Sequence, residues 1–385
     1  MKITISTEEL DAVVKKLAIV TNKMSKMTYG VKKIVTMSSR KAVQGDRVVY
    51  PTTFTSFNGK VQVAVNLYAL SGDYEEAFTI NVGSEFISAV QAISKAGGET
   101  TIFIVSDNSC EIVCGDARIT LTTKVEGLAP VAFDLADRTL LEGAFQVEKA
   151  AFASAFKEVA IAADNDENSP FVGVGITEDD GMLALRAISS ALMAESRCPV
   201  KEGGGKPVTG LSVDSSVLKD IFGVIAGDSI CIYKTVNHAV IQGEAELWQI
   251  PLLASSIPPE SLDKLKGMQR DTEMVVNKSR LSVAISIALS VMAKDEKPLI
   301  VLKTDNGQLL LSNKGNTASA KAELSNLTGE CTGIYLNAVL LQKTLACAKG
   351  EELLIRSGSN NTPVLIRDAD ENSRAVWIIA PINAR

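Results

Sequence analysis

The sequence predicts an α+β protein of three repeated domains, because one pattern of helix, glycine and strand occurs three times in its 385 residues. In each copy a helix of apolar periodicity ends at a glycine, and a strand follows at once. The glycines are Gly98, Gly227 and Gly350, spaced by about one domain length. We assign each glycine to the left-handed backbone position that ends a helix.

A second shared unit lies upstream of each glycine and consists of a helix, a strand, a tight turn and another strand. The helices are predicted over residues 7–21, 148–163 and 277–293. Thr7 and Asn277 are the expected N-caps of the first and third helices. The three turns, which carry strong hairpin signals, are Asn58-Gly59, Asp180-Gly181 and Asn306-Gly307.

The repeat divides the chain into three domains, each with two helices and short antiparallel strands. Polar and proline-containing stretches mark the boundaries, so that the domains span 1–137, 138–268 and 269–385. The first domain has a longer path from its first helix to its turn than the other two. We therefore expect an extra segment in this domain, within residues 38–51.

The composition indicates a globular protein, with 46% hydrophobic and 22% charged residues. The net charge of −6 argues against a protein that holds nucleic acid chiefly by a basic surface. No apolar run of membrane-spanning length occurs and the N-terminus lacks a signal-peptide core, so we expect a cytoplasmic protein. The six cysteines form no CxxC pattern, and reduced core thiols are favoured over disulfides or a metal site.

The sequence offers few groupings of polar residues that could form a catalytic site. The glycine-rich run before Lys206 is followed by Pro207, unlike a phosphate-binding loop. The acidic stretches 178–181 and 368–373 lie where turns are expected, and the single histidine, His238, lies in an alternating strand. We predict no catalytic residue, no cofactor and no metal. A metal-dependent hydrolase that uses the acidic turns is the alternative from a different class.

Three segments carry a resemblance to a known family: "MKITISTEEL" at the N-terminus, "GIYLNAVLLQKTLACAKGEELLIR" in the third domain, and the ending "TPVLIRDADENSRAVWIIAPINAR". The chain resembles the bacterial DNA polymerase III beta subunit, the sliding clamp, as a divergent member. The resemblance implies a head-to-tail homodimer whose six domains close a ring around double-stranded DNA. It also implies a non-catalytic processivity factor that tethers the polymerase III catalytic subunit, the clamp loader and other proteins with a clamp-binding motif.

In the family, helices line the hole of the ring, so basic residues on or near the predicted helices should face the DNA. A ring holds DNA by topology and needs few phosphate contacts, which is compatible with an acidic chain. The alternative is that these residues only solvate exposed helix faces. The candidates are Lys15, Lys16, Lys23, Lys26, Lys95, Lys149, Lys157, Lys219, Lys278, Arg280, Lys343 and Lys349.

Ring closure in the family pairs an edge strand of the first domain with the third domain of the partner. By resemblance the edge strand contains Ile119 and Leu121, and it meets the end of the helix around Ile287 and Leu289. An edge strand with an apolar face needs a partner strand, because it is otherwise an aggregation hazard. The alternative is that Ile119 and Leu121 belong to the core.

The family binds its partners through a short peptide that docks between the second and third domains. Carried over by resemblance, this peptide pocket consists of Val172, Ile188, Ser190, Leu192, Met193, Pro258, Asn337, Leu340, Pro363, Ile378, Ala380, Pro381 and Ile382. The stretch "ISSALM" at 188–193 lacks the His and Arg that the family commonly has there, and "APINAR" replaces the usual Met-containing ending. A divergent clamp of plasmid or phage type, with altered or dedicated partners, is therefore the second hypothesis.

The apolar run near the end of the chain needs a structural explanation, because chain ends are usually polar and frayed. We predict that Val376 to Ile379 form the last strand of the third domain, paired through the turn 368–373 with the strand before it. Pro381 and Ile382 follow this strand, where the resemblance places one wall of the peptide pocket.

Overall fold

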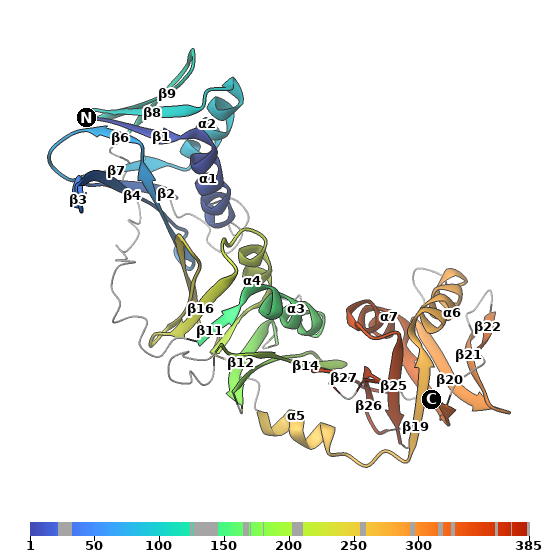
Figure 1. Ribbon diagram of the computed structural model, residues 1–385. Helices are drawn as coiled ribbons and strands as arrows, with labels where there is room; N and C mark the ends of the chain where they lie inside the picture. The colour runs from blue at the N-terminus through green and yellow to red at the C-terminus, as the bar shows by residue number, and fades with distance from the viewer. Residues whose placement is uncertain are drawn as a thin grey trace. The chain divides into compact units, whose positions relative to one another are not determined.

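The computed structural model has an α+β fold in which every strand pairing is antiparallel, as the sequence predicts (Figure 1). It describes residues 1–21, 33–123, 125, 145–164, 169, 171–179, 181–201, 211–254, 259–292, 297–314, 319–324, 328–358, 361–370 and 372–382. These residues form two compact units. Unit 1 contains the described residues of Met1–Lys149, Lys201–Val208 and Ser216–Leu252, and unit 2 those of Ala150–Val200, Thr209–Ser215 and Leu253–Arg385.

Unit 1 contains a five-stranded sheet of order β10-β9-β8-β1-β6 and a nine-stranded sheet of order β11-β16-β17-β18-β5-β4-β2-β7, in which β3 pairs with β4. Phe54, Phe86 and Phe103 pack together in its core. Its elements are β1 (Lys2–Ser6), α1 (Thr7–Thr21), β2 (Ile34–Ser39), β3 (Ala42–Gln44), β4 (Arg47–Phe57), β5 (Gln62–Ala69), β6 (Ser71–Asp73), β7 (Phe78–Gly83), α2 (Glu85–Ile93), a 3-10 turn (Ser94–Ala96), β8 (Thr100–Val105), β9 (Ser109–Cys114), β10 (Ala117–Thr122), β11 (Phe145–Glu148), α4 (Ser215–Phe222), β16 (Ser229–Lys234), β17 (His238–Gln242) and β18 (Glu246–Pro251).

Unit 2 contains a nine-stranded sheet of order β15-β12-β13-β14-β27-β26-β25-β19-β23 and a four-stranded sheet of order β22-β21-β20-β24. Its elements are α3 (Lys149–Ala160), β12 (Gly173–Asp179), β13 (Met182–Ile188), β14 (Leu192–Pro199), β15 (Leu211–Asp214), α5 (Pro259–Lys266), β19 (Thr272–Asn277), α6 (Lys278–Ser290), β20 (Leu299–Asp305), β21 (Gln308–Lys314), β22 (Ser319–Leu324), β23 (Thr328–Gly329), β24 (Thr332–Asn337), α7 (Ala338–Cys347), β25 (Glu352–Ser357), β26 (Val364–Asp368) and β27 (Ala375–Ile379).

The two nine-stranded sheets have the same strand order, which reveals the repeat in three dimensions. The strands correspond one by one when the order β7-β2-β4-β5-β18-β17-β16-β11 is aligned with the order β15-β12-β13-β14-β27-β26-β25-β19. The pair β5 and β18, here called the first joint, therefore corresponds to the pair β14 and β27, the second joint. Each joint unites strands from two of the predicted domains. The division at 137 and 268 itself remains a prediction.

The first hairpin of the first repeat is longer than its counterparts, which confirms the expected extra segment. Strands β2 and β3 pair with β4 in one continuous register, from Ile34 opposite Phe57 to Gln44 opposite Arg47. The tip turns at Gly45, where φ is 62°. Strand β12 pairs with the seven-residue strand β13, whereas β4 has 11 residues. The extra residues thus lengthen both arms of this hairpin.

The predicted equivalence of the three turns is wrong for the first repeat. Asn58-Gly59 joins β4 to β5, which is the second hairpin, whereas Gly181 and Asn306-Gly307 follow the first strands β12 and β20 of their hairpins. The true counterpart is the elongated turn at Gly45. The turn residues correctly indicate a hairpin in each repeat. They do not indicate whether it is the first or the second hairpin, because that depends on the order of strands in the sheet.

Two of the three helix-ending glycines also differ from the prediction. Gly227 is left-handed with φ of 85°, but in the first repeat the left-handed residue is Gly97, with φ of 80°, and not Gly98. Gly350 is not left-handed, and its N–H donates to Asp368 Oδ1 at 3.0 Å. A Cβ at Gly350 would lie 3.1 Å from the Asp368 side chain, so close approach explains this glycine.

The helix starts and the last strand agree with expectation except at one cap. Asn277 Oδ1 accepts the Arg280 N–H at 3.1 Å and caps α6. Thr7 is the first residue of α1, and the hydroxyl that accepts from the first turn belongs to Ser6. Strand β27 pairs with β26 as predicted and also with β14, so Trp377 is fully buried.

Candidate functional site

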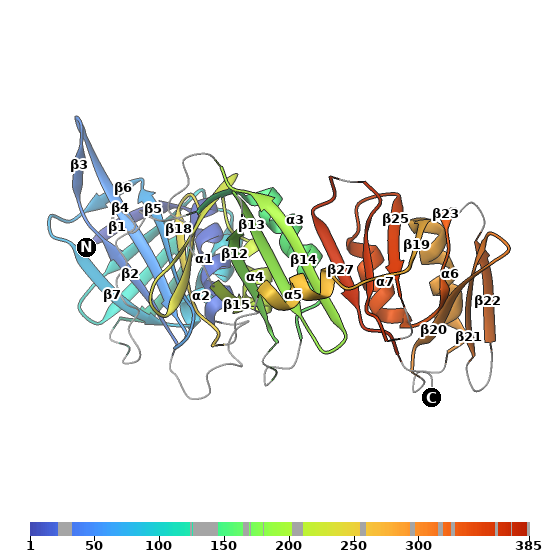
Figure 2. The same cartoon turned by 90° about the horizontal axis from the view of Figure 1, so that it is seen from below.

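The outer face of the second joint is an apolar cluster covered by α5 (Figure 2). Met193 of β14 lies opposite Ile378 of β27, and both pack against Leu262, which is fully buried. Ile188, Leu265 and Val376 surround this cluster and remain half-buried. Burying Leu262 contributes about 1.5–3 kcal/mol, which holds α5 on the sheet.

Leu262 and Leu265 are the site residues that sequence reasoning missed. The signal was present, since they lie three residues apart in an otherwise polar stretch, "PESLDKLK". Residues with this spacing share one face of a helix. The prolines and charges of this stretch are typical of a domain boundary, which is why the sequence alone predicts one near residue 268. An isolated pair of leucines does not reveal which surface the helix covers.

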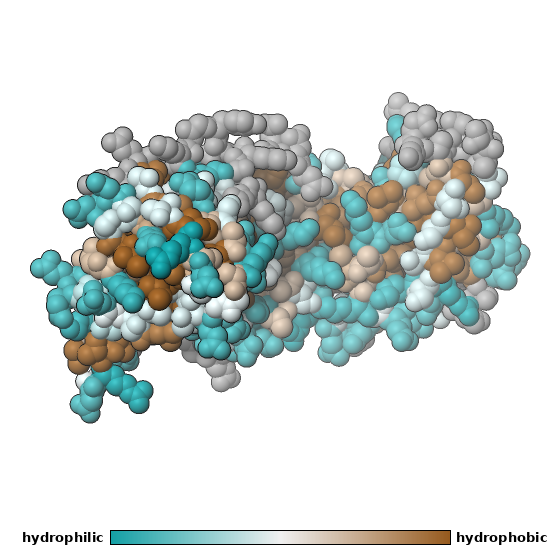
Figure 3. All heavy atoms as spheres, turned by 90° about the horizontal axis from the view of Figure 1, so that it is seen from above, coloured by the Kyte–Doolittle hydropathy of each residue, from teal (hydrophilic) through white to brown (hydrophobic). Residues whose placement is uncertain are grey.

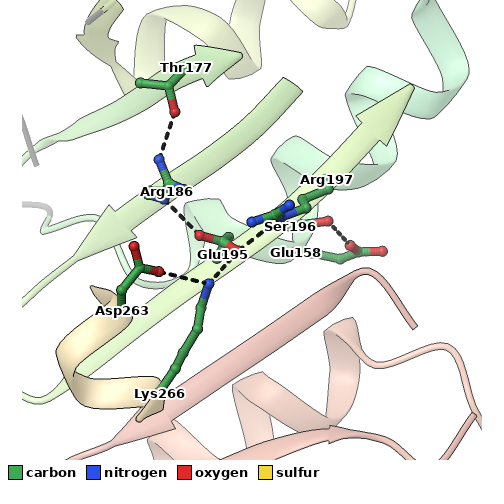
Figure 4. Close-up of polar contacts among 8 residues, drawn as sticks. All are labelled: Glu158, Thr177, Arg186, Glu195, Ser196, Arg197, Asp263 and Lys266. Atoms are coloured by element: carbon green, nitrogen blue, oxygen red, sulfur yellow. Dashed lines mark hydrogen bonds and ion pairs between the residues drawn. The ribbon is translucent and has the colours of Figure 1, made fainter. Parts of the chain in front are cut away.

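A buried carboxylate, Glu195, ties α5 to the sheet beside this cluster (Figure 4). Its oxygens lie 2.6 Å from Lys266 Nζ and 2.7 Å from Arg186 Nε, and the residue is 4% exposed. Burial opposes ionisation, but Lys266 and Arg186 outweigh it and hold the pKa of the Glu195 carboxyl below its usual value. The carboxylate therefore stays charged and anchors Lys266 at the end of α5.

The segment after α5 is held by Arg270. Its guanidinium donates to the Pro363 carbonyl at 3.0 Å and to the Leu265 carbonyl at 2.7 Å. Burial, together with the charge of Arg356, lowers the pKa of Arg270. Arg270 thus links the end of α5 to Pro363, one of the residues predicted for the peptide pocket.

The structure brings together only part of the predicted peptide pocket. Ile188, Met193 and Ile378 lie on the face that α5 covers. Leu192 lies opposite Ile379 and, because adjacent strand residues point to opposite faces, does not share that face with Met193. Its place in the pocket therefore remains a prediction. Ser190 is exposed in the turn between β13 and β14.

Ala380 and Ile382 are fixed beside the second joint by backbone hydrogen bonds. The Ala380 N–H donates to the Ala191 carbonyl and the Ile382 N–H to the Tyr335 carbonyl, both at 2.9 Å. Ala380, Pro381 and Ile382 are half-buried. Of the remaining predicted residues, Asn337 caps α7 by accepting from the N–H groups of Val339 and Leu340. Val172 precedes β12, and Leu340 and Pro363 are half-buried. Pro258 lies outside the described residues.

The predicted DNA-facing residues differ in exposure. Lys16 is corrected, because it is 8% exposed and its Nζ lies 2.8 Å from Glu246 Oε2. Lys149 and Lys278 are half-buried and donate to the carbonyls of Ile225 and Ala348. Lys23 and Lys26 lie outside the described residues. The exposed candidates are Lys15, Lys95, Lys157, Lys219, Arg280, Lys343 and Lys349.

The predicted dimer residues lie on β10 and on α6, and each of these elements is at or beside an edge of a sheet of the described residues. Strand β10, with half-buried Ile119 and Leu121, is the edge of the five-stranded sheet, and β22 is the edge of the four-stranded sheet. Beside β22, a groove of about 440 Å³ runs along α6 and is lined by Val283, Ile287 and Leu324. Ile287 is 46% exposed and Leu289 is half-buried. Figure 3 shows hydrophobic residues among hydrophilic ones on one face of the molecule.

Neither a metal centre nor a reactive thiol stands out in the described part of the chain. No group of three or more His, Cys, Asp or Glu side chains suited to a metal occurs among the described residues. All six cysteines are free, and burial raises the pKa of the Cys110 and Cys198 thiols to about 12. None of the described helices is both long and apolar enough to cross a membrane.

A chain of repeated two-helix units on antiparallel sheets, with two matched nine-stranded sheets, has the fold of the DNA polymerase III beta subunits, the sliding clamps. The DNA polymerase III subunit beta from Pseudomonas aeruginosa superposes with a TM-score of 0.83 at 16% identity, and the beta subunit from Streptococcus pyogenes with 0.82 at 16%. The sliding clamp from Bacillus subtilis gives 0.80 at 17%. In all three comparisons 100% of both chains is covered.

No protein-family model and no curated protein matches the sequence. The likeness at 16–17% identity therefore shows the fold of a divergent chain.

Proposed function

We propose that the protein is a DNA sliding clamp: a non-catalytic processivity factor that encircles double-stranded DNA and tethers a replicative polymerase. The observation that carries the proposal is the fold match over 100% of the chain. The proposal places the protein in the bacterial cytoplasm, where such DNA is replicated. An acidic protein can hold DNA in this way because a closed ring retains the duplex by topology, with few phosphate contacts.

The internal repeat supports closure of a ring from more than one copy. In the first two repeats a strand edge, β5 or β14, pairs with the last strand of the following repeat, β18 or β27. The matching edge in the third repeat is β22, and the last strand of the first repeat is β10. Both are sheet edges. Pairing β22 of one copy with β10 of another would repeat the joint and cover both of these edges.

Helix positions support the same closure. The tenth residue of the first helix in each repeat is Lys16, Glu158 or Ile287. Lys16 and Glu158 are buried at the first and second joints, whereas Ile287 is 46% exposed. An apolar residue at this position fits a third joint, in which Ile119 and Leu121 of a second copy cover the groove along α6.

The partner-binding surface in this proposal is the rim of the cluster under α5, formed by the half-buried residues Ile188, Leu265 and Val376, with Ala380, Pro381 and Ile382 beside the second joint. Its partners would be the polymerase III catalytic subunit, the clamp loader and other proteins with a clamp-binding motif. Two apolar peptide side chains buried there contribute about 1.5–3 kcal/mol each. Micromolar binding requires about −8 kcal/mol, so backbone hydrogen bonds must supply the rest.

Loading the protein onto nicked circular DNA with a clamp loader, and then linearising the circle, tests the proposal. A ring slides off the free ends, so retention falls after linearisation and not after a mock digest. Retention that is equal on circular and linear DNA would contradict a topological hold. Sedimentation of the free protein should give a dimer of 40.9 kDa subunits, and a stable monomer at micromolar concentration would argue against the ring.

A second candidate is a divergent clamp with dedicated partners, for which the composition of the site is the specific observation. The half-buried residues Ile188, Leu265 and Val376 are aliphatic, and the stretch 188–193 contains no His or Arg. Titration with a clamp-binding-motif peptide separates the two candidates. Binding at micromolar peptide supports a general clamp, and no binding at high micromolar peptide supports the dedicated one.

A further inference from the structure

We infer that the DNA backbone contacts of this protein are concentrated on unit 2, at the ends of α3 and α7, and that the helices of the first repeat contribute little. The inference rests on the proposed function, because it assigns residues to the DNA that a clamp would encircle. Its ligand is the phosphate backbone of duplex DNA, and its key residues are Lys157, Lys343 and Lys349.

The helices of the first and third repeats have opposite charge character. Helices α6 and α7 contain Lys278, Arg280 and Lys343 and no acidic residue, and Lys349 follows α7. The acidic residues nearest to α7 along the chain, Glu351 and Glu352, lie beyond that helix. Acidic residues outnumber the two lysines within α1 and α2, and they are Glu8, Glu9, Asp11 and Glu85.

Three lysines on or next to the described helices of the first repeat, Lys15, Lys16 and Lys95, are also largely neutralised by their neighbours. Lys15 Nζ lies 2.7 Å from Asp11 Oδ2, one helical turn earlier. Lys16 is buried against Glu246. Lys95 borders a hollow that is also lined by Glu8 and Asp11. A phosphate that approached this surface would meet carboxylates beside every lysine, so the net attraction is small.

The contrast is sharpest at one matched helix position. Lys15 and Lys157 are both the ninth residue of the first helix in their repeats, counted from Thr7 and from Lys149. The residue four positions earlier is Asp11 in α1 and Ala153 in α3. Lys157 therefore lacks the i,i+4 carboxylate that pairs with Lys15.

Unit 2 places three exposed lysines, Lys157, Lys343 and Lys349, at the adjoining ends of α3 and α7. The Cys347 thiol lies 3.6 Å from the Lys157 carbonyl oxygen, which joins the ends of α3 and α7. Lys343 lies one helical turn before Cys347 and is exposed. Lys349 contacts the buried carboxylate of Glu158, yet its side chain is 63% exposed. These residues form one cationic surface in which the acidic partner is buried and the cations reach solvent.

Two double variants of equal charge change test the inference: Lys157→Ala with Lys343→Ala, and Lys15→Ala with Lys95→Ala. The affinity of each for a short fluorescent duplex is measured by anisotropy at several salt concentrations. Each lost phosphate contact lowers the slope of log K against log salt by about 0.9. We expect a decrease of about 2 for the unit 2 variant and of less than about 0.5 for the first-repeat variant.

Asp11→Ala provides the converse test. It places an alanine four residues before Lys15, as Ala153 lies four residues before Lys157 in α3. It should release Lys15, tighten duplex binding and steepen the salt slope by up to about 1. Equal slope losses in the two double variants would overturn the inference, as would no effect of Asp11→Ala. Sedimentation verifies that each variant keeps the assembly state of the unmodified protein.

The linearisation experiment keeps this inference separate from the proposed function. If the unmodified protein does not slide off linear DNA, the proposed function fails. If it slides off but both double variants bind duplex equally, only the location of the contacts is wrong.

Discussion

The two joints of the molecule have the same strand order, but they bury helix residues of opposite charge and pair them with different partners. At the first joint, between β5 and β18, Lys16 of α1 is buried and pairs with Glu246. At the second, between β14 and β27, the matching helix residue is Glu158, which accepts from Ser196 Oγ at 2.5 Å and contacts Lys349. The sign of the buried charge is reversed, and in each case the partner comes from another element.

The tryptophans at the joints show the same divergence. Trp248 and Trp377 occupy matching strand positions, opposite Val63 and Ala194, and both are fully buried. The Trp377 indole N–H donates to the Glu158 carbonyl at 2.9 Å, whereas the Trp248 indole N–H has no hydrogen-bond partner among the described residues. Strand pairing and apolar packing therefore define a joint, and each repeat satisfies its polar groups in its own way.

The largest expected effect is a loss of partner binding, which we assign to the second joint and not to the first. Ile382→Asp introduces a carboxylate into the proposed peptide pocket, where burying an unpaired charge costs several kcal/mol. We expect at least about 1,000-fold weaker binding of a clamp-binding partner, with the dimer intact. Peptide titration and sedimentation measure the two quantities, with Ile382→Val as the matched control. A dimer that dissociates would place Ile382 in the subunit interface instead.

The next largest effect is the loss of stability when the buried ion pair of the first joint is broken. Lys16→Ala leaves the fully buried Glu246 carboxylate without its counter-charge, and such losses cost about 3–5 kcal/mol. The neighbouring variant Lys15→Ala removes only an exposed pair with Asp11 and should cost less than about 0.5 kcal/mol. Urea unfolding followed by tryptophan fluorescence compares them. Equal stability of the two variants would show that Lys16 is not buried as described.

A smaller effect compares the two tryptophans directly. Trp377→Phe leaves the Glu158 carbonyl without its donor, which costs about 1–3 kcal/mol beyond the lost packing. Trp248→Phe removes a donor that has no partner, so only the packing loss remains. Thermal unfolding should therefore show the larger destabilisation for Trp377→Phe. The comparison fails if Trp248→Phe is equally or more destabilised.

The smallest effect concerns the pH dependence of the second joint. The pKa of Glu195 is lowered in the folded protein, so its stabilisation is fully present above the usual carboxyl pKa of about 4.3 and is lost as the pH falls through the folded value. Lys266→Met removes one partner and should cost about 1 kcal/mol at neutral pH. Melting temperatures measured from pH 7 to 3 should converge for the two proteins. A constant difference would mean that Lys266 acts through packing alone.

Local patterns in the sequence determined the elements and their repetition. Apolar periodicity located α1 over residues 7–21, Asn277 marked the start of α6, and the run after Ala375 was recognisable as a strand. These features depend on residues a few positions apart, so they can be read without knowing the fold. Gly98 shows the limit of this reading, because the sequence could not tell which glycine of the pair takes the left-handed conformation.

Only the tertiary structure decided which elements meet. Asn58-Gly59 signals a hairpin, but the order of strands in the sheet makes it the second hairpin of its repeat. Lys16 finds its partner at Glu246, 230 positions away in the chain. Leu262 becomes part of the candidate site because α5 packs on β14 and β27. Such contacts form when distant segments share one core, and no local spacing specifies them.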